Sequence, residues 1–308
     1  MRILRGRWWW LLFAILLLLP LVIAGCDEFD DDDETRLQAV LTGLQEVPPV
    51  TTNASGSGSV TLPDDNGFFN ASLQASGFAT TVMAAHIHYG EPGENGPILF
   101  TLFNAAEDGT FPGTINRRFT AADFETQPLG SPIGSFNEAV DAIRRGDTYF
   151  NVHTTANPDG EVRGQIGARF FAADLTGANV VPPVTTTGTG DANAVIDRDR
   201  DTLGVGVITG GLTNANVMAI RVHYGEVGEE GPALFTVFDS AVDGAYTGLA
   251  SAMLTSTDLE TQPPGSPVGS FRDALEAIED GNAYISVETT TNPDGEIRGQ
   301  FSRFTIIP

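Results

Sequence analysis

Short runs in which apolar and polar residues alternate recur along most of the chain. They are rich in Val, Ile, Phe and Thr, and clusters of Gly, Pro, Asn and Asp separate them. Alternation with a period of two predicts strands that bury one face, and the clusters predict turns between them. In the first half of the chain we expect strands near 36–42, 57–62, 67–75, 84–89, 97–103, 113–119, 148–156 and 161–170.

One stretch, "GSFNEAVDAIRRG", has the period of a helix instead. Ser135 and Glu138 are spaced as in a capping box, and Gly146 is placed to end the helix. The apolar stripe consists of Phe136, Val140 and Ile143. We therefore expect one short helix that packs its apolar stripe on a sheet.

The chain contains the same pattern twice. The stretch "LTGLQEVPPVTT" at Leu41 returns as "LTGANVVPPVTT" at Leu175, 134 residues later, and "TTANPDGEVRGQI" at Thr154 returns as "TTTNPDGEIRGQF" at Thr289, 135 residues later. A repeat of this length has the size of a whole domain and is too long for a solenoid unit. The helical stretch is repeated as well, with Ser270 at its start.

This duplication predicts the domain organisation. We expect domain 1 at residues 36–168 and domain 2 at residues 169–308. The predicted fold class is all-β: two tandem antiparallel Greek-key domains, sandwiches or barrels, each with one short inserted helix.

The N-terminal segment has the pattern of an export signal. Arginines precede an apolar run from Trp8 to Ala24 that ends in small residues, so we expect residues 1–25 to direct export. The ending "LVIAGC" resembles a bacterial lipobox, which implies cleavage before Cys26, a lipid on its sulfur, and anchoring to a bacterial membrane at a periplasmic or cell-surface location. The alternative is an uncleaved anchor, because the run is close to the shortest length that spans a bilayer.

Charge and cysteine content restrict the interpretation further. Residues 26–35 are expected to form an acidic tether, because acids fill seven of the eight positions from Asp27 to Glu34. The whole chain has a formal net charge of −24, which argues against nucleic acid as a partner. Cys26 is the one cysteine, so no disulfide forms within a chain and stability must come from apolar cores.

The candidate chemistry is carried by histidines. In "AAHIHYGEPGENGP", strand alternation sends Ile87 inward and both His86 and His88 outward. In the hairpin "YFNVHTTANPDGEVRGQI", a three-residue Pro-Asp-Gly loop would pair His153 with Gln165 and would place His153 on the outer face too. Three imidazoles on neighbouring strands can bind copper or zinc.

The second copy supports this hypothesis because two of the three histidines are replaced in it. It has Arg221 and Glu288 at the positions of His86 and His153. Since the two replacements carry opposite charges, we expect these positions to touch, with an ion pair in domain 2 where domain 1 has a metal site formed by His86, His88 and His153. The alternative is a polar contact without metal in either copy.

Two paired motifs, "AHIHYGEPGENGPILFTL" and "YFNVHTTANPDGEVRGQI", resemble the CHRD domain, which is named from chordin and occurs in many exported bacterial proteins. The resemblance covers both copies and implies an extracytoplasmic β-sandwich. It implies no single activity, because in chordin such domains belong to a growth-factor-binding protein and the bacterial members have largely unassigned roles. Domain 2 departs from the motif at Arg221 and Glu288.

The outward H-X-H strand is also similar to the copper site of Cu,Zn superoxide dismutase. That enzyme uses further histidines, one of them bridging two metals, whereas domain 1 has three in all. We therefore expect no such redox activity, and no catalytic motif of a hydrolase or nucleotide-binding enzyme appears. Arg163 and Arg298, each two residues after a Glu, are expected to form weak surface ion pairs.

Two functions follow from the sequence. The first is a membrane-tethered, non-enzymatic binding protein whose domain 1 binds copper through its three histidines. The second is an adhesion or scaffold module that presents loops to a protein or glycan partner without any metal.

Overall fold

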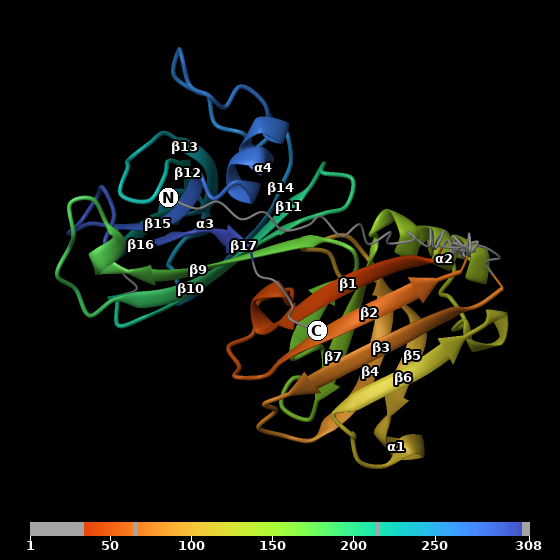
Figure 1. Ribbon diagram of the computed structural model, residues 1–308. Coiled ribbons are helices and arrows are strands. Elements are labelled where there is room, and N and C mark those ends of the chain that lie inside the picture. The colour runs from red at the N-terminus through yellow and green to blue at the C-terminus, as the bar shows by residue number, and fades with distance from the viewer. Residues whose placement is uncertain (1–33, 64–66, 214–215, 304–308) are drawn as a thin grey trace, which may run out of the picture. The chain divides into compact units, whose positions relative to one another are not determined.

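The computed structural model describes residues 34–63, 67–213 and 216–303 (Figure 1). The strands of the first repeat are β1 (Thr35–Thr42), β2 (Ser55–Leu62), β3 (Phe69–Ser76), β4 (Val82–Tyr89), β5 (Ile98–Asn104), β6 (Thr114–Phe119), β7 (Thr148–Thr154) and β8 (Val162–Gln165). Those of the second are β9 (Arg169–Thr176), β10 (Thr189–Ile196), β11 (Leu203–Gly210), β12 (Val217–Tyr224), β13 (Ala233–Asp239), β14 (Leu249–Leu254), β15 (Ala283–Thr289), β16 (Ile297–Gln300) and β17 (Ser302–Arg303).

Helical elements are few. The α-helices are α1 (Ala105–Asp108), α2 (Phe136–Arg145), α3 (Ser240–Asp243) and α4 (Phe271–Glu279). Short 3-10 turns are η1 (Gly43–Gln45), η2 (Ala121–Asp123) and η3 (Gly177–Asn179). Among the described residues, no helix is both long enough and apolar enough to cross a bilayer. The expected export signal at residues 1–25, Cys26 and nearly all of the acidic tether lie outside the described residues.

Each repeat forms one antiparallel sheet that curls into a nearly closed barrel. The first sheet has the order β5-β4-β7-β8-β1-β2-β3-β6, and the second repeats it as β13-β12-β15-β16-β9-β10-β11-β14. In Figure 1, β1, β2 and β3 run side by side in the first repeat, with β6 beyond β3. The predicted all-β fold with tandem Greek-key domains is confirmed.

The strand predicted at 161–170 is wrong in one respect. The structure divides it into β8 and β9, because the chain turns at Gly167, where φ is 81°. This left-handed conformation costs glycine little, and it separates the last strand of the first sheet from the first strand of the second.

The predicted register of the β7–β8 hairpin is also wrong. His153 does not pair with Gln165; the observed pairs are Val152 with Val162, Asn151 with Arg163, and Tyr149 with Gln165. The loop is wider because Thr154 closes it locally, accepting a hydrogen bond from the backbone of Asn157 and donating one to Glu161. The shift is four residues, an even number, so the outward face of His153 is unchanged.

The inserted helix α2 forms as predicted, with one altered contact. Ser135 caps it by accepting from the backbone of Glu138, and Gly146 ends it in the left-handed region with φ 92°. The Glu138 carboxylate accepts from the backbone of Gly134, at 2.7 Å, instead of completing a capping box with Ser135. The short helices α1 and α3 were not predicted.

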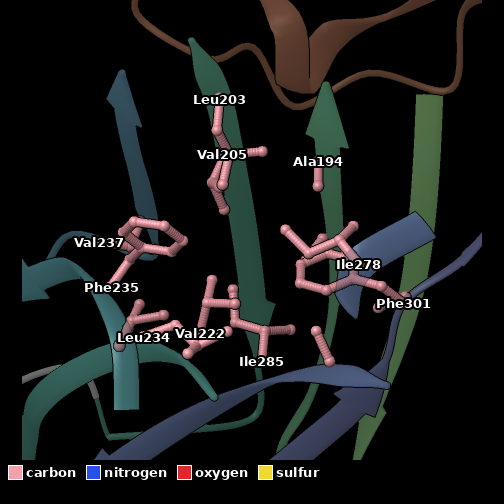
Figure 2. Packing of buried hydrophobic residues seen from close by; sticks show 14 of the residues in the cluster. Ala194, Leu203, Val205, Val222, Leu234, Phe235, Val237, Ile278, Ile285 and Phe301 are labelled. Carbon is pink, nitrogen blue, oxygen red and sulfur yellow. The ribbon is translucent and has the colours of Figure 1, made fainter. Parts of the chain in front are cut away.

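Each barrel has its own apolar interior. In the first, Phe69 packs against Phe100 and Phe119 with ring centroids 4.9 and 5.0 Å apart, and the buried side of α2 joins them. In the second, Figure 2 shows Val205, Val222 and Ile285 from different strands pointing toward one another. Because these interiors use the inward positions, the outward positions of β4 and β7 remain for polar contacts.

Candidate metal centre

Strand β4 places two imidazoles on the outer face of the first barrel. Ala85 and Ile87 are fully buried in the interior, so His86 and His88 point the other way. Strand β4 pairs with β7, and Ala84 lies opposite His153. The pairing of these two strands, which are about 60 residues apart in sequence, brings the third imidazole to the other two.

The three rings form a compact cluster. Ring centroids lie 4.9 Å apart for His86 and His153, 5.4 Å for His86 and His88, and 5.6 Å for His88 and His153. One nitrogen from each ring can be chosen so that all three lie within 4.8 Å of one another. Nitrogens at this separation can coordinate one ion after small rotations of the side chains, since metal–nitrogen bonds are about 2.0–2.1 Å long.

One buried nitrogen in each ring has no hydrogen-bond partner among the described residues: Nδ1 of His86, Nε2 of His88 and Nε2 of His153. The opposite nitrogens of two rings are held by the backbone. Nδ1 of His88 lies 3.0 Å from the Gly96 carbonyl, and Nδ1 of His153 lies 3.0 Å from the Pro158 carbonyl. Because a carbonyl only accepts, Nδ1 carries the proton and Nε2 presents its lone pair to the cluster.

The environment keeps the three imidazoles neutral. Burial lowers the pKa of His86 to about 3, with repulsion from His153 and His88 adding to the effect. Burial also lowers the pKa of His88 to about 4, against the hydrogen bond to Gly96, and it lowers the pKa of His153. Neutral imidazole is the form that binds a metal ion.

The ring of His88 stacks on Tyr149, and Tyr149 in turn stacks on Arg163. The His88 ring lies 5.1 Å from the Tyr149 ring with planes 12° apart, and Cζ of Arg163 lies 3.5 Å from the centroid of Tyr149. Arg163 is buried and donates to the carbonyls of Glu91 and Glu94, both at 2.7 Å. The prediction of a surface ion pair for Arg163 is therefore wrong: the guanidinium fixes the loop that supplies the Gly96 carbonyl.

Tyr149 was not predicted as part of this site, although the sequence of the second repeat pointed to it. Tyr284 and Arg298 occupy the same positions in the second repeat, and the stack is found there too, with Cζ of Arg298 3.4 Å from the ring centroid of Tyr284. Retention of an aromatic residue on a polar face in both copies indicated a shared structural role.

Two further residues that the sequence did not predict, Asn151 and Glu46, lie beside the cluster. Asn151 is the cross-strand neighbour of His86, and its Nδ2 donates to Oε2 of Glu46 at 3.4 Å. Burial raises the pKa of Glu46 to about 8, although the nearby Arg163 and the hydrogen bond from Asn151 act in the opposite direction. In the second repeat these positions are Val180 and Ser286, so this pair occurs only beside the three histidines.

Glu161 and Gln165 hold the surrounding loops and strands together by hydrogen bonds. Glu161 accepts hydrogen bonds of 2.6 Å from the hydroxyls of Thr52 and Thr154. Burial works to raise the pKa of Glu161, but these hydrogen bonds outweigh it and the pKa is lowered. Gln165 donates to the carbonyls of Gly90 and Gly146.

The structure also brings Arg221 and Glu288 together in the second repeat, as an ion pair. His223, the counterpart of His88, keeps its Nδ1 at 3.1 Å from the Gly231 carbonyl, while its Nε2 lies 3.7 Å from Oε1 of Glu288. A guanidinium and a carboxylate thus occupy the space that corresponds to the cluster of free nitrogens in the first repeat.

Both repeats of the chain are similar to known proteins. The CHRD domain family matches residues 37–166 and again residues 171–301. Chordin from Xenopus laevis is 28% identical over 281 residues, covering 86% of this chain and 26% of that protein. Chordin from Danio rerio is 25% identical over 279 residues, with the same coverage of 86% and 26%. The chain therefore spans about a quarter of the length of these curated relatives.

Proposed function

The chain belongs to the CHRD domain family and contains two copies of the domain, and from this premise we propose that it is an extracytoplasmic binding protein whose first domain binds one copper ion. The ligands are Nδ1 of His86, Nε2 of His88 and Nε2 of His153. The second domain binds no metal, because Arg221 and Glu288 neutralise each other in the equivalent place.

The observation that carries this proposal is the set of three buried, convergent nitrogens without a hydrogen-bond partner among the described residues. A buried polar atom left unsatisfied costs about 1–3 kcal/mol. Three such atoms facing one point would be expensive unless a cation shares their lone pairs. The backbone carbonyls of Gly96 and Pro158 support this role, because a ligating imidazole usually donates its other N–H to such a group.

The donor set favours copper. Three neutral imidazoles without a carboxylate suit Cu and Zn, and divalent copper binds nitrogen sites more tightly than the other first-row metals. Three protein ligands leave a coordination position for an external ligand, so the ion can also serve as a point of attachment for a partner that carries a donor atom. We assign the site to binding and not to catalysis.

The remainder of the chain is proposed to present this site outside the cytoplasm. Residues 1–25 act as the export signal, Cys26 carries a lipid, and residues 26–35 form an acidic tether before domain 1 at 36–168 and domain 2 at 169–308. The support is the lipobox-like "LVIAGC" ending, which stands at the end of the apolar run. Mass spectrometry of the membrane fraction tests this, since Cys26→Ser should remove the lipid mass and release the protein.

Calorimetric titration of the purified chain with Cu(II) and Zn(II) tests the metal site. We expect one copper ion per chain, and loss of that binding in His86→Ala and in His153→Ala. His223→Ala is the matched control, because it removes the fourth histidine of the chain without touching the cluster. The proposal fails if His86→Ala binds copper like the wild type, or if His223→Ala loses it.

A further inference from the structure

A second feature of the first domain lies away from the histidines, on the outer face of β1, β2, β3 and β6. The inward positions of these strands are buried, as Val60, Ala71 and Leu73 show. The outward positions are exposed or partly exposed and are occupied by small hydroxyl and amide side chains. They include Ser57, Ser59, Thr61, Asn70, Ser72 and Asn116.

An arginine stands at each end of one row across this face. Arg36 on β1 pairs with Thr61, Thr61 pairs with Asn70, and Asn70 pairs with Arg118 on β6. Three steps between neighbouring strands separate the two arginines by roughly 14 Å at the backbone. Cζ of Arg118 lies 3.6 Å from the ring centroid of Phe68. Neither arginine forms an ion pair with any described residue.

This face is hollowed, and none of its four strands contains an Asp or a Glu. Two shallow hollows of about 430 and 160 Å³ share Arg36, Ser59 and Ser72 in their walls, and no Asp or Glu among the described residues lines either. The chain as a whole has 40 acidic and 16 basic residues, whereas these four strands contain arginines and no acid. An anionic ligand would be repelled by most of the protein and attracted here.

None of the four polar or charged residues of this row is present at the equivalent position of the second repeat. Phe170, Val195, Gly204 and Met253 stand in register where the first repeat has its two arginines, Thr61 and Asn70. The fold is the same in both repeats, so the polar row is not needed to form the sheet. It is a property of domain 1 alone.

From this arrangement we propose that the outer face of β1, β2, β3 and β6 binds an acidic polysaccharide. Carboxylate or sulfate groups of the polymer pair with Arg36 and Arg118, and sugar hydroxyls exchange hydrogen bonds with the row between them. Hydroxyl and amide groups both donate and accept, as sugar hydroxyls do. Trp and Tyr, which often anchor protein interfaces, are absent from these four strands. The inference is independent of the metal site.

Binding is tested with the full chain and defined polymers in about 0.15 M salt, where exposed charges act over about 8 Å. The probes are polygalacturonate, which carries carboxylates, dextran sulfate, and neutral dextran as the uncharged control. We expect binding to an acidic polymer and none to dextran, and the preferred polymer identifies the anionic group. Arg36→Gln combined with Arg118→Gln should weaken binding by about tenfold or more, because two charge-assisted contacts are lost.

Arg145→Gln combined with Arg272→Gln is the matched control. It removes the same charge from exposed positions elsewhere, and it should change the affinity by less than about twofold. Ser72→Trp, which keeps the charge but fills the hollows, should weaken binding as well. The proposal is overturned if neither acidic polymer binds, or if the control pair weakens binding as much as the test pair. Since His86→Ala should leave polymer binding intact, failure here and failure of the copper proposal are distinguishable.

Discussion

Arg221 forms an ion pair with Glu288 at the two positions that His86 and His153 occupy in the first domain. Both side chains are largely shielded from solvent, with exposed fractions of 29% and 13%. The strand pairing that joins these positions is the same in both barrels, because β4 pairs with β7 as β12 pairs with β15. One backbone geometry therefore supports two chemistries, and exchange of side chains should convert one into the other.

The first prediction is that Arg221→His combined with Glu288→His creates a second metal site. His223 already has its Nδ1 at the Gly231 carbonyl, so its Nε2 is oriented toward the new imidazoles. Calorimetry should give two copper ions per chain instead of one. Glu288→His alone should leave one, since the guanidinium of Arg221 would remain in the site, where it repels a cation and offers no lone pair. A folded double variant that still binds one ion would show that the two barrels position these side chains differently.

The second prediction concerns the stability of domain 2. Glu288→Ala leaves the half-buried Arg221 without its partner, and we expect the free energy of unfolding to fall by about 1–3 kcal/mol, measured by urea denaturation. The control is Asp147→Ala, which breaks the pair of Asp147 with the more exposed Arg145. That change should cost less than about 1 kcal/mol. Equal losses in the two variants would contradict the assignment of a shielded pair.

The third prediction separates stacking from hydrogen bonding at Tyr149. Tyr149→Phe keeps the ring between His88 and Arg163 and removes one hydrogen bond, from the backbone of Gly96, so it should cost about 1 kcal/mol of stability. Tyr149→Leu removes the flat surface from both neighbours and should lower copper affinity by about 10–100-fold. Titration with copper measures both variants. Similar affinities for them would mean that the stack does not orient His88.

The fourth prediction is a pH dependence due to Glu46. Its pKa is raised from 4.5 to about 8 in the folded protein, so between these values the folded state holds a proton that the unfolded state has released. The contribution of Glu46 to stability is therefore complete below about pH 4.5 and is lost as the pH rises through about 8. In this window the wild type should lose up to about 1.4 kcal/mol per pH unit relative to Glu46→Gln, which cannot ionise. Denaturation of both proteins from pH 5 to 9 measures the difference, and parallel curves would refute it.

The fifth prediction is that copper stabilises the wild type and not His86→Ala. A ligand that binds only the folded state adds about 2.7 kcal/mol when its free concentration is 100 times its Kd. Thermal unfolding with copper, and again after a chelator is added, should show a rise in Tm that the chelator reverses. A rise of the same size in His86→Ala would place the metal elsewhere in the chain.

Local patterns in the sequence were sufficient for several features. The alternation of "HIH" predicted the outward direction of His86 and His88, and the spacing of Ser135 and Gly146 predicted both ends of α2. The duplication was visible in paired motifs, and the opposite charges of Arg221 and Glu288 predicted that these positions touch. These inferences succeed because side-chain direction in a strand and capping of a helix depend on residues close in sequence.

Longer-range relationships required the structure. The hairpin register was wrong by four residues, because a loop closed by the Thr154 side chain replaced the expected tight turn. Arg163 was expected at the surface, yet it is buried on the ring of Tyr149 beneath a loop from another part of the chain. That loop is far from Arg163 in the sequence, so the residues next to Arg163 could not predict the contact.

The sequence alone determined that the chain is a duplicated β fold and which side chains face away from the cores. Tertiary structure decided that β4 lies beside β7, that three ring nitrogens converge while the opposite nitrogens of two rings are held by carbonyls, and that Arg36 and Arg118 end one row across the sheet. The physical reason is that a period of two fixes the face of a residue but not its neighbours. Neighbours across a sheet are chosen by backbone hydrogen bonds between strands far apart in the chain, and by the packing of the whole barrel.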